Sequence, residues 1–153
     1  MTMRRVAPFV AAVMMTVSGL AMAIDVDRVT VRNSSNSTVG QVDSDGTIRN
    51  SSNSTVGKID KDGTIRNASN STVGKVENDG TVRNSSNSTI GKIESDGTLR
   101  NSSNSTVGKI DSDGTIRNSS NSSVGKVDGY SPRLRHMVAA VLFFGGSVSV
   151  LKL

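Results

Sequence analysis

Apolar residues in the middle of the chain recur with a fixed period of 17 residues, in units of consensus T-I-R-N-S-S-N-S-T-V-G-K-I-D-S-D-G. Each unit has three apolar positions, as in Ile48, Val56 and Ile59. The units are rich in Gly, Asn, Ser and β-branched residues and have no apolar stripe of helical period, which predicts strands and turns. The six units open at Thr30, Thr47, Thr64, Thr81, Thr98 and Thr115.

The Asp-Gly sequence of each unit predicts a tight hairpin. A three-residue loop over Ser44-Asp45-Gly46, with the glycine in the left-handed region, places Val42 opposite Ile48 and Asp43 opposite Thr47. A two-residue Asp-Gly turn would instead set Asp43 against Ile48. We favour the three-residue loop because it pairs apolar with apolar side chains.

The Asn-Ser segment predicts a second turn of the same kind. A loop over Ser51-Ser52-Asn53, with the asparagine in the left-handed region that Asn tolerates, pairs Ile48 with Val56 and Arg49 with Thr55. Two turns per unit therefore give about two strands per unit, joined as a meander.

One position conflicts with a regular strand. Val56 and Ile59 are three residues apart and would point to opposite faces, so we expect a bulge at Gly57 to restore a common apolar face. The recurring glycines are thus expected to be structural and not to cradle a ligand. The same register places Lys58 opposite Arg66, a like-charge pair.

These patterns predict an all-β fold of tandem 17-residue hairpins over residues 24–130. A single hairpin cannot bury its one apolar face, so the hairpins must close radially or stack. A parallel coil with a flat array of threonines, suited to ice, is an alternative that leaves the hairpin signals unexplained.

The repeat resembles the β-flower proteins of bacteria, which are built from tandem D-G-T-[IV]-R-x-S-S-x-x-T-[IV]-G units. Asp62-Gly63-Thr64-Ile65-Arg66-Asn67-Ala68-Ser69 carries the motif, which covers about residues 29–129. Asn53 stands where the family's turn leads us to expect glycine. The resemblance implies radial closure with pseudo-five-fold symmetry, an apolar C-terminal segment and no assigned activity. Five complete Asp-Gly turns fit that number but six unit openings do not, so five-fold and six-fold closure both stay open.

Residues 1–23 have the pattern of a bacterial secretory signal. Arg4 and Arg5 precede an apolar run that ends at Ala21-Met22-Ala23, a small-residue cleavage site. An uncleaved membrane anchor is the alternative, but the run is interrupted and short for a bilayer. We therefore predict an exported protein, periplasmic, cell-surface or extracellular, cleaved near Ala23. Cleavage would lower the formal charge from +5 to +3, because two arginines and no acidic residue are lost.

After the repeats, residues 131–153 form an apolar C-terminal segment. Met137 to Phe144 is continuously apolar and is followed by Gly145-Gly146, with Lys152 near the end. The segment is short and broken for a membrane anchor. We predict that it is helical and packs with the repeats as a central plug, where it supplies the apolar bulk that they lack.

Composition narrows the possible chemistry. The chain is 34% hydrophobic and 3% aromatic, with no Cys and a single His136. A thiol nucleophile, a thiolate zinc site and a multi-histidine metal cluster within one chain are therefore excluded. His136 has no recognisable nucleophile and carboxylate to act with, and we interpret it as a boundary residue. The sequence has no cluster of basic residues interleaved with aromatic residues, so we expect no nucleic-acid partner.

Function is the part that the sequence predicts least. We expect no enzyme and no cofactor, but an exported structural or binding module whose partner is unknown. The alternative is a surface binder of glycan, calcium or ice that uses the repeated polar rim. Pairs of turn aspartates resemble the start of a calcium loop but lack its later bidentate carboxylate, so turn chemistry explains them better. These weak metal candidates are Asp43, Asp45, Asp60, Asp62, Asp111 and Asp113.

Overall fold

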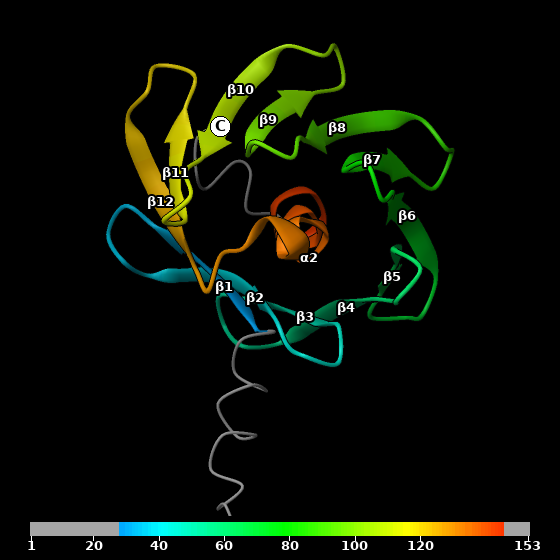
Figure 1. Ribbon diagram of the computed structural model, residues 1–153. Coiled ribbons are helices and arrows are strands. Elements are labelled where there is room, and N and C mark those ends of the chain that lie inside the picture. The colour runs from blue at the N-terminus through cyan, green and yellow to red at the C-terminus, as the bar shows by residue number, and fades with distance from the viewer. Residues whose placement is uncertain (1–27, 146–153) are drawn as a thin grey trace, which may run out of the picture.

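The computed structural model describes residues 28–145, and in this part of the chain the strands form one closed barrel. Consecutive strands pair antiparallel, and the first pairs with the last. The strands are β1 (Val29–Asn33), β2 (Thr38–Val42), β3 (Thr47–Asn50), β4 (Thr55–Ile59), β5 (Thr64–Asn67), β6 (Thr72–Val76), β7 (Thr81–Asn84), β8 (Thr89–Ile93), β9 (Thr98–Asn101), β10 (Thr106–Ile110), β11 (Thr115–Asn118) and β12 (Ser123–Asp128). The prediction of an all-β fold of hairpins that closes radially is confirmed (Figure 1).

The described strands make six two-stranded hairpins, β1–β2 through β11–β12, each spanning an Asn-Ser loop. Neighbouring hairpins are joined by the Asp-Gly turns, and a chain of six hairpins has five such connections. The five turns counted in the sequence are therefore links between hairpins. Six hairpins close the ring, one more than the resemblance implied, and the sixth junction, between β1 and β12, has no connecting turn.

The Asp-Gly turn has the predicted register. Val42 pairs with Ile48, and the Asp43 backbone N–H donates to the Thr47 carbonyl at 2.9 Å. Gly46 has φ +86°, and its N–H donates to the Asp43 carbonyl at 2.9 Å. A side chain at this backbone angle would be strained, and a Cβ would also run into the Ile59 carbonyl. Both the positive φ and the close contact with the Ile59 carbonyl therefore require glycine at this position.

The Asn-Ser loop also forms, with Asn53 at φ 61° and Arg49 opposite Thr55 as predicted. The next pair differs from the prediction, because Ile48 lies opposite Gly57 and not Val56. Val56 is the extra residue of the bulge, half-buried at the edge of the core.

Crowding between strands explains why the bulge is one residue earlier than predicted. Gly57 is buried in β4, and a Cβ on it would overlap the Arg66 carbonyl oxygen on β5. The position that faces Ile48 must therefore be occupied by the residue without a side chain. The prediction paired apolar residues across the strands, and that criterion could not reveal the close approach of the two backbones at Gly57.

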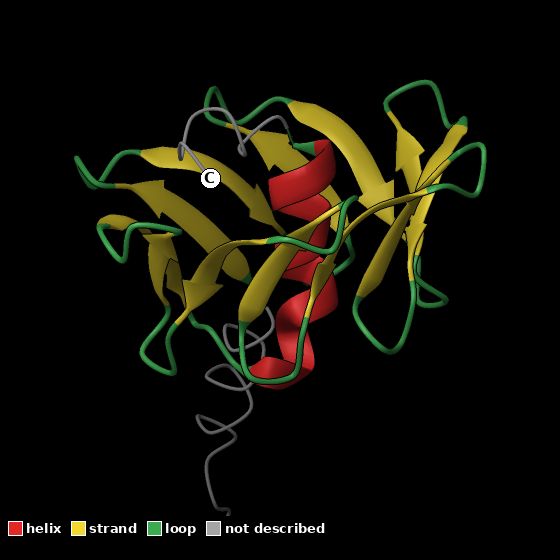
Figure 2. Cartoon of the chain, turned by 90° about the horizontal axis from the view of Figure 1, so that it is seen from above, coloured by secondary structure: helices red, strands yellow, loops and turns green. Residues whose placement is uncertain are grey.

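Residues 132–144 of the C-terminal segment pass through the middle of the ring (Figures 1 and 2). They are helical throughout, as η2 (Pro132–Leu134), α2 (Arg135–Ala139) and η3 (Ala140–Phe144). Val138 to Leu142 are at most 1% exposed, and Leu134 and Met137 are also buried. The prediction of a helical central plug is confirmed for residues 132–144.

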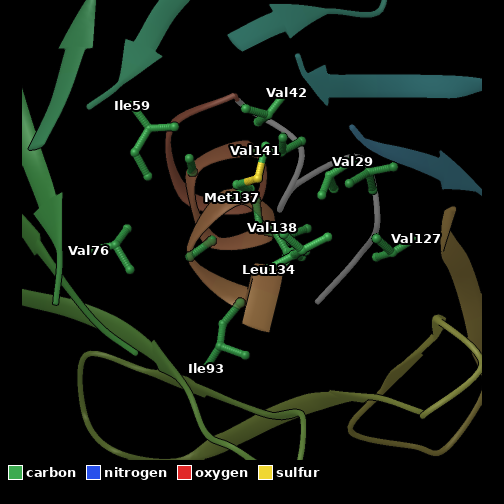
Figure 3. Packing of buried hydrophobic residues seen from close by; sticks show 14 of the residues in the cluster. Val29, Val42, Ile59, Val76, Ile93, Val127, Leu134, Met137, Val138 and Val141 are labelled. Atoms are coloured by element: carbon green, nitrogen blue, oxygen red, sulfur yellow. The ribbon is translucent and has the colours of Figure 1, made fainter. Parts of the chain in front are cut away.

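Each hairpin lines the interior with apolar side chains at two equivalent positions, and the first hairpin adds Val29; these side chains surround the plug (Figure 3). The alternation of inward apolar and outward polar residues along each strand produces this lining. The inward positions are Val31, Ile48, Ile65, Val82, Leu99 and Ile116 in the first strand of each hairpin, and Val42, Ile59, Val76, Ile93, Ile110 and Val127 in the second.

Two predictions concern residues at the ends of the chain. The predicted signal sequence, residues 1–23, lies outside the described residues, as do residues 146–153 at the end of the predicted plug segment. Among residues 28–145, the structure contains no helix long and apolar enough to cross a membrane.

Candidate functional site

The first repeated polar contact joins the arginine of each unit after the first to the acidic residue six positions earlier. The Arg49 Nε donates to the Asp43 carboxylate at 2.7 Å, and Arg66 to Asp60 at 2.9 Å. Lys58 does lie opposite Arg66, as predicted. The Asp60 carboxylate now accounts for how this like-charge pair is tolerated.

The second contact fixes the Asp-Gly turn. The Asp45 carboxylate accepts hydrogen bonds from the Thr47 backbone N–H and hydroxyl, both at 2.9 Å. These two donors favour the charged form and hold the pKa of Asp45 below its ordinary value of 3.8, with the nearby Lys58 charge adding to the effect. The same arrangement lowers the pKa of Asp62, Asp79, Asp96 and Asp113.

The third contact was missed in the sequence. The side-chain oxygen of Asn50 accepts hydrogen bonds from the backbone N–H groups of Ser52 and Ser54, both at 3.0 Å. This is the local side-chain-to-backbone bonding typical of Asn in turns. The sequence feature that could have predicted this contact is the Asn that occupies the same position before every Ser-rich loop.

The weak metal candidates are occupied by these contacts. Asp43, Asp60 and Asp111 bind arginines, while Asp45, Asp62 and Asp113 bind threonines. The described part of the chain contains no group of three or more potential metal-ligating side chains. Calcium at these turns stays a prediction, and it would require a cation to displace the arginine and threonine donors.

The two ends of the barrel differ in chemistry, because antiparallel strands place all Asn-Ser loops at one end and all Asp-Gly turns at the other. The loop end has exposed, uncharged Ser and Asn side chains. Inside it, beside Phe143 at the end of the plug, lies an apolar cavity of about 300 Å³. Its other lining residues are Ile90, Leu99, Arg100, Asn101, Val107 and Leu142.

The turn end has a cleft of about 260 Å³ between the barrel and the start of the plug. Lys61, Arg133, Arg135 and His136 line it, and Arg135 donates to the Asn78 backbone carbonyl. Burial lowers the pKa of His136, against the opposing effect of the Arg133 backbone. His136 thus lies at the boundary between repeats and plug, as predicted, but within a basic cleft that the sequence did not reveal.

Comparison with known proteins adds the family. Residues 21–94 and 58–138 each match the family described as "5-fold beta-flower protein", so that the two matches together span residues 21–138. No curated protein and no solved structure matches the chain significantly. The repeated hairpins, their radial closure and these matches, which cover more than half of the sequence, agree with one another. This chain is therefore a member of the beta-flower family.

Proposed function

We propose that the protein is an exported, non-enzymatic module that acts as a structural element or by binding. The observation that supports this most is the use of its repeated polar residues. In unit after unit the arginine binds an acidic side chain, the aspartate binds a threonine and the asparagine binds a loop backbone. These groups hold the ring together, and a repeated scaffold of this kind is typical of proteins that present surfaces.

Export rests on the pattern of residues 1–23 and is tested by location and mass. In a bacterial host that secretes proteins, we expect the chain outside the cytoplasm, beginning at Ile24. Placing a charge in the apolar run with Val13→Arg should retain it in the cytoplasm at full length. A wild-type chain found in the cytoplasm with residues 1–23 attached would refute export.

A second candidate is a glycan binder that uses the loop end. It is favoured by the apolar cavity beside Phe143 inside a crown of uncharged amide and hydroxyl side chains, because sugars present both apolar faces and hydroxyl groups. Of the ligands considered for the polar rim, glycan is the one that this cavity favours, while calcium stays a prediction for the Asp-Gly turns at the other end. Ice requires a flat surface, whereas these loops follow a closed ring.

A glycan array probed with the secreted chain tests this candidate. Binding that falls at least tenfold in Phe143→Ala, with no change in Lys109→Gln on the outer surface, would support it. Absence of binding to bacterial cell-wall glycans and capsular polysaccharides would leave the purely structural role as the better account.

A further inference from the structure

The charges of the barrel follow a pairing rule. Each acidic residue at the end of a hairpin, such as Asp60, binds the next arginine, and Asp128 binds Arg32 to complete the ring. Each turn aspartate, such as Asp45, is close to a lysine of the next unit, Lys58. All 11 acidic residues between positions 28 and 145 are matched in this way to 11 of the 15 basic residues.

Four basic residues of the described chain remain outside this rule: Arg28, Lys61, Arg133 and Arg135. Arg28 lies 3.3 Å from the Asp43 carboxylate, which it shares with Arg49. The other three all line the cleft at the turn end. Three of the four basic residues outside the rule are therefore gathered in one cleft.

The cleft has one acidic side chain in its wall, Glu77, and it is already engaged. Its carboxylate accepts a hydrogen bond from the Arg83 Nε at 2.8 Å. A neighbouring cavity of about 160 Å³ shares Lys61 and His136 but is lined by Asp45 and Asp60, so the basic character belongs to the first cleft.

The repeat itself does not require this lysine. The position of Lys61 is occupied by Ser44, Ser95 and Ser112 in three other units, whose turns have the same backbone hydrogen bonds. Arg133 and Arg135 come from the plug, more than 70 positions along the chain. The repeat symmetry of the barrel is thus broken at this cleft, where Lys61 of the repeats meets Arg133 and Arg135 of the plug.

We propose that this cleft binds the phosphate group of a small molecule. Two guanidinium groups and one ammonium group in one cleft suit a dianion better than a single carboxylate, and arginine forks match phosphate oxygens in geometry. The volume corresponds to about eight or nine water molecules, enough for a phosphate with a small organic group. This goes beyond the proposed function, since it concerns the folded barrel whether or not the chain is exported.

Calorimetric titration of the full chain at low salt tests the site, with inorganic phosphate and glycerol 3-phosphate as probes. Lys61→Ser installs the residue found in other units and should keep the fold while weakening phosphate binding about tenfold. Arg133→Gln should weaken it similarly. The matched control is Lys109→Gln, which installs the residue that Gln41 provides at the same repeat position and lies outside the cleft.

The outcomes separate a site from general attraction. Tight binding of citrate without binding of either phosphate probe would overturn the ligand class. Equal losses in Lys61→Ser and Lys109→Gln, or none in Lys61→Ser, would overturn the site. Matching melting temperatures of the variants without ligand ensure that a loss reflects binding.

Discussion

Arg32 on β1 and Asp128 at the end of β12 form an ion pair, Nε to Oδ2, between residues 96 positions apart. Elsewhere in the barrel the same pair joins residues six positions apart, as in Asp60 and Arg66. The junction between first and last strand therefore repeats the chemistry of the internal junctions, without a connecting turn.

The missing turn makes this junction the easiest to open. In an internal junction, a broken ion pair leaves two strands tethered by a short loop, so reclosure costs little entropy. We predict that Arg32→Gln speeds hydrogen exchange in β1 and β12, whereas Arg66→Gln has little effect on β4 and β5. Both pairs are partly exposed, so the double-mutant coupling energy should be about 0.2–1 kcal/mol in each. Equal exchange at both junctions would contradict the prediction.

The sequence also contains a more specific sign of ring closure, which the ion pair makes recognisable. Arg32 has Val26 six positions before it, and Asp128 has Leu134 six positions after it, so each lacks the partner that the repeat provides. An arginine without its acidic partner at the start of the repeats and an acidic residue without its arginine at the end can pair with each other only if the ring closes. This also favours six hairpins over five.

Other features depend on packing that no single unit contains. Gly74 and Gly91 lie against the rings of Phe144 and Phe143, where a Cβ would collide. The choice of Gly57 and not Val56 opposite Ile48 belongs to the same crowded interior. The basic cleft likewise needs Lys61 and Arg133 side by side, which local patterning cannot show.

The plug should be essential for folding. The ring side chains enclose it, and Leu142 is 1% exposed. We predict that a chain ending at His136 loses cooperative thermal unfolding, because the inward faces of six hairpins would be left without a partner. The milder variant Leu142→Ala should lower the free energy of unfolding by about 2–5 kcal/mol. Lys109→Gln, on the surface, should change it by less than about 0.5 kcal/mol. A cooperatively folded monomer without the plug would show that the barrel is self-sufficient.

The Asn-Ser loops should depend on their first asparagine. Asn50→Ala removes the acceptor for the Ser52 and Ser54 N–H groups and should cost about 1–2 kcal/mol of stability in urea unfolding. Asn50→Asp keeps an oxygen in that place and is the matched control. If alanine proved as stable as aspartate, the side chain would contribute nothing to the loop.

Asn53 offers a separate test of the same loop, through its backbone. It has φ 61°, a region that costs most residues about 1–2 kcal/mol. We predict that Asn53→Ala is destabilised by about that amount, while Asn53→Gly is at least as stable as wild type in the same urea titration. An alanine variant as stable as the glycine variant would mean that the loop can change conformation.

The turn aspartates should make the barrel sensitive to acid. Hydrogen bonds from the Thr47 N–H and hydroxyl favour ionised Asp45, so its pKa in the folded state lies below 3.8, its ordinary value. A depressed pKa contributes stability that is fully present above 3.8 and is lost as the pH falls through the folded-state pKa. We predict that carbon NMR titration of the side-chain carboxyls finds Asp45, Asp62 and their equivalents all titrating below 3.8.

Thr47→Val isolates the hydroxyl in this effect. It keeps the backbone donor but removes the side-chain donor, so the pKa of Asp45 should rise toward 3.8, and acid unfolding should begin at higher pH. The four unaltered aspartates, Asp62, Asp79, Asp96 and Asp113, are internal controls in the same sample and should keep their values. A wild-type Asp45 that titrates at or above 3.8 would show that the turn does not hold its carboxylate in solution. The repeat gives this experiment five copies of one interaction, so a pKa change confined to Asp45 is a local effect of the substitution at Thr47 and not a change in the whole barrel.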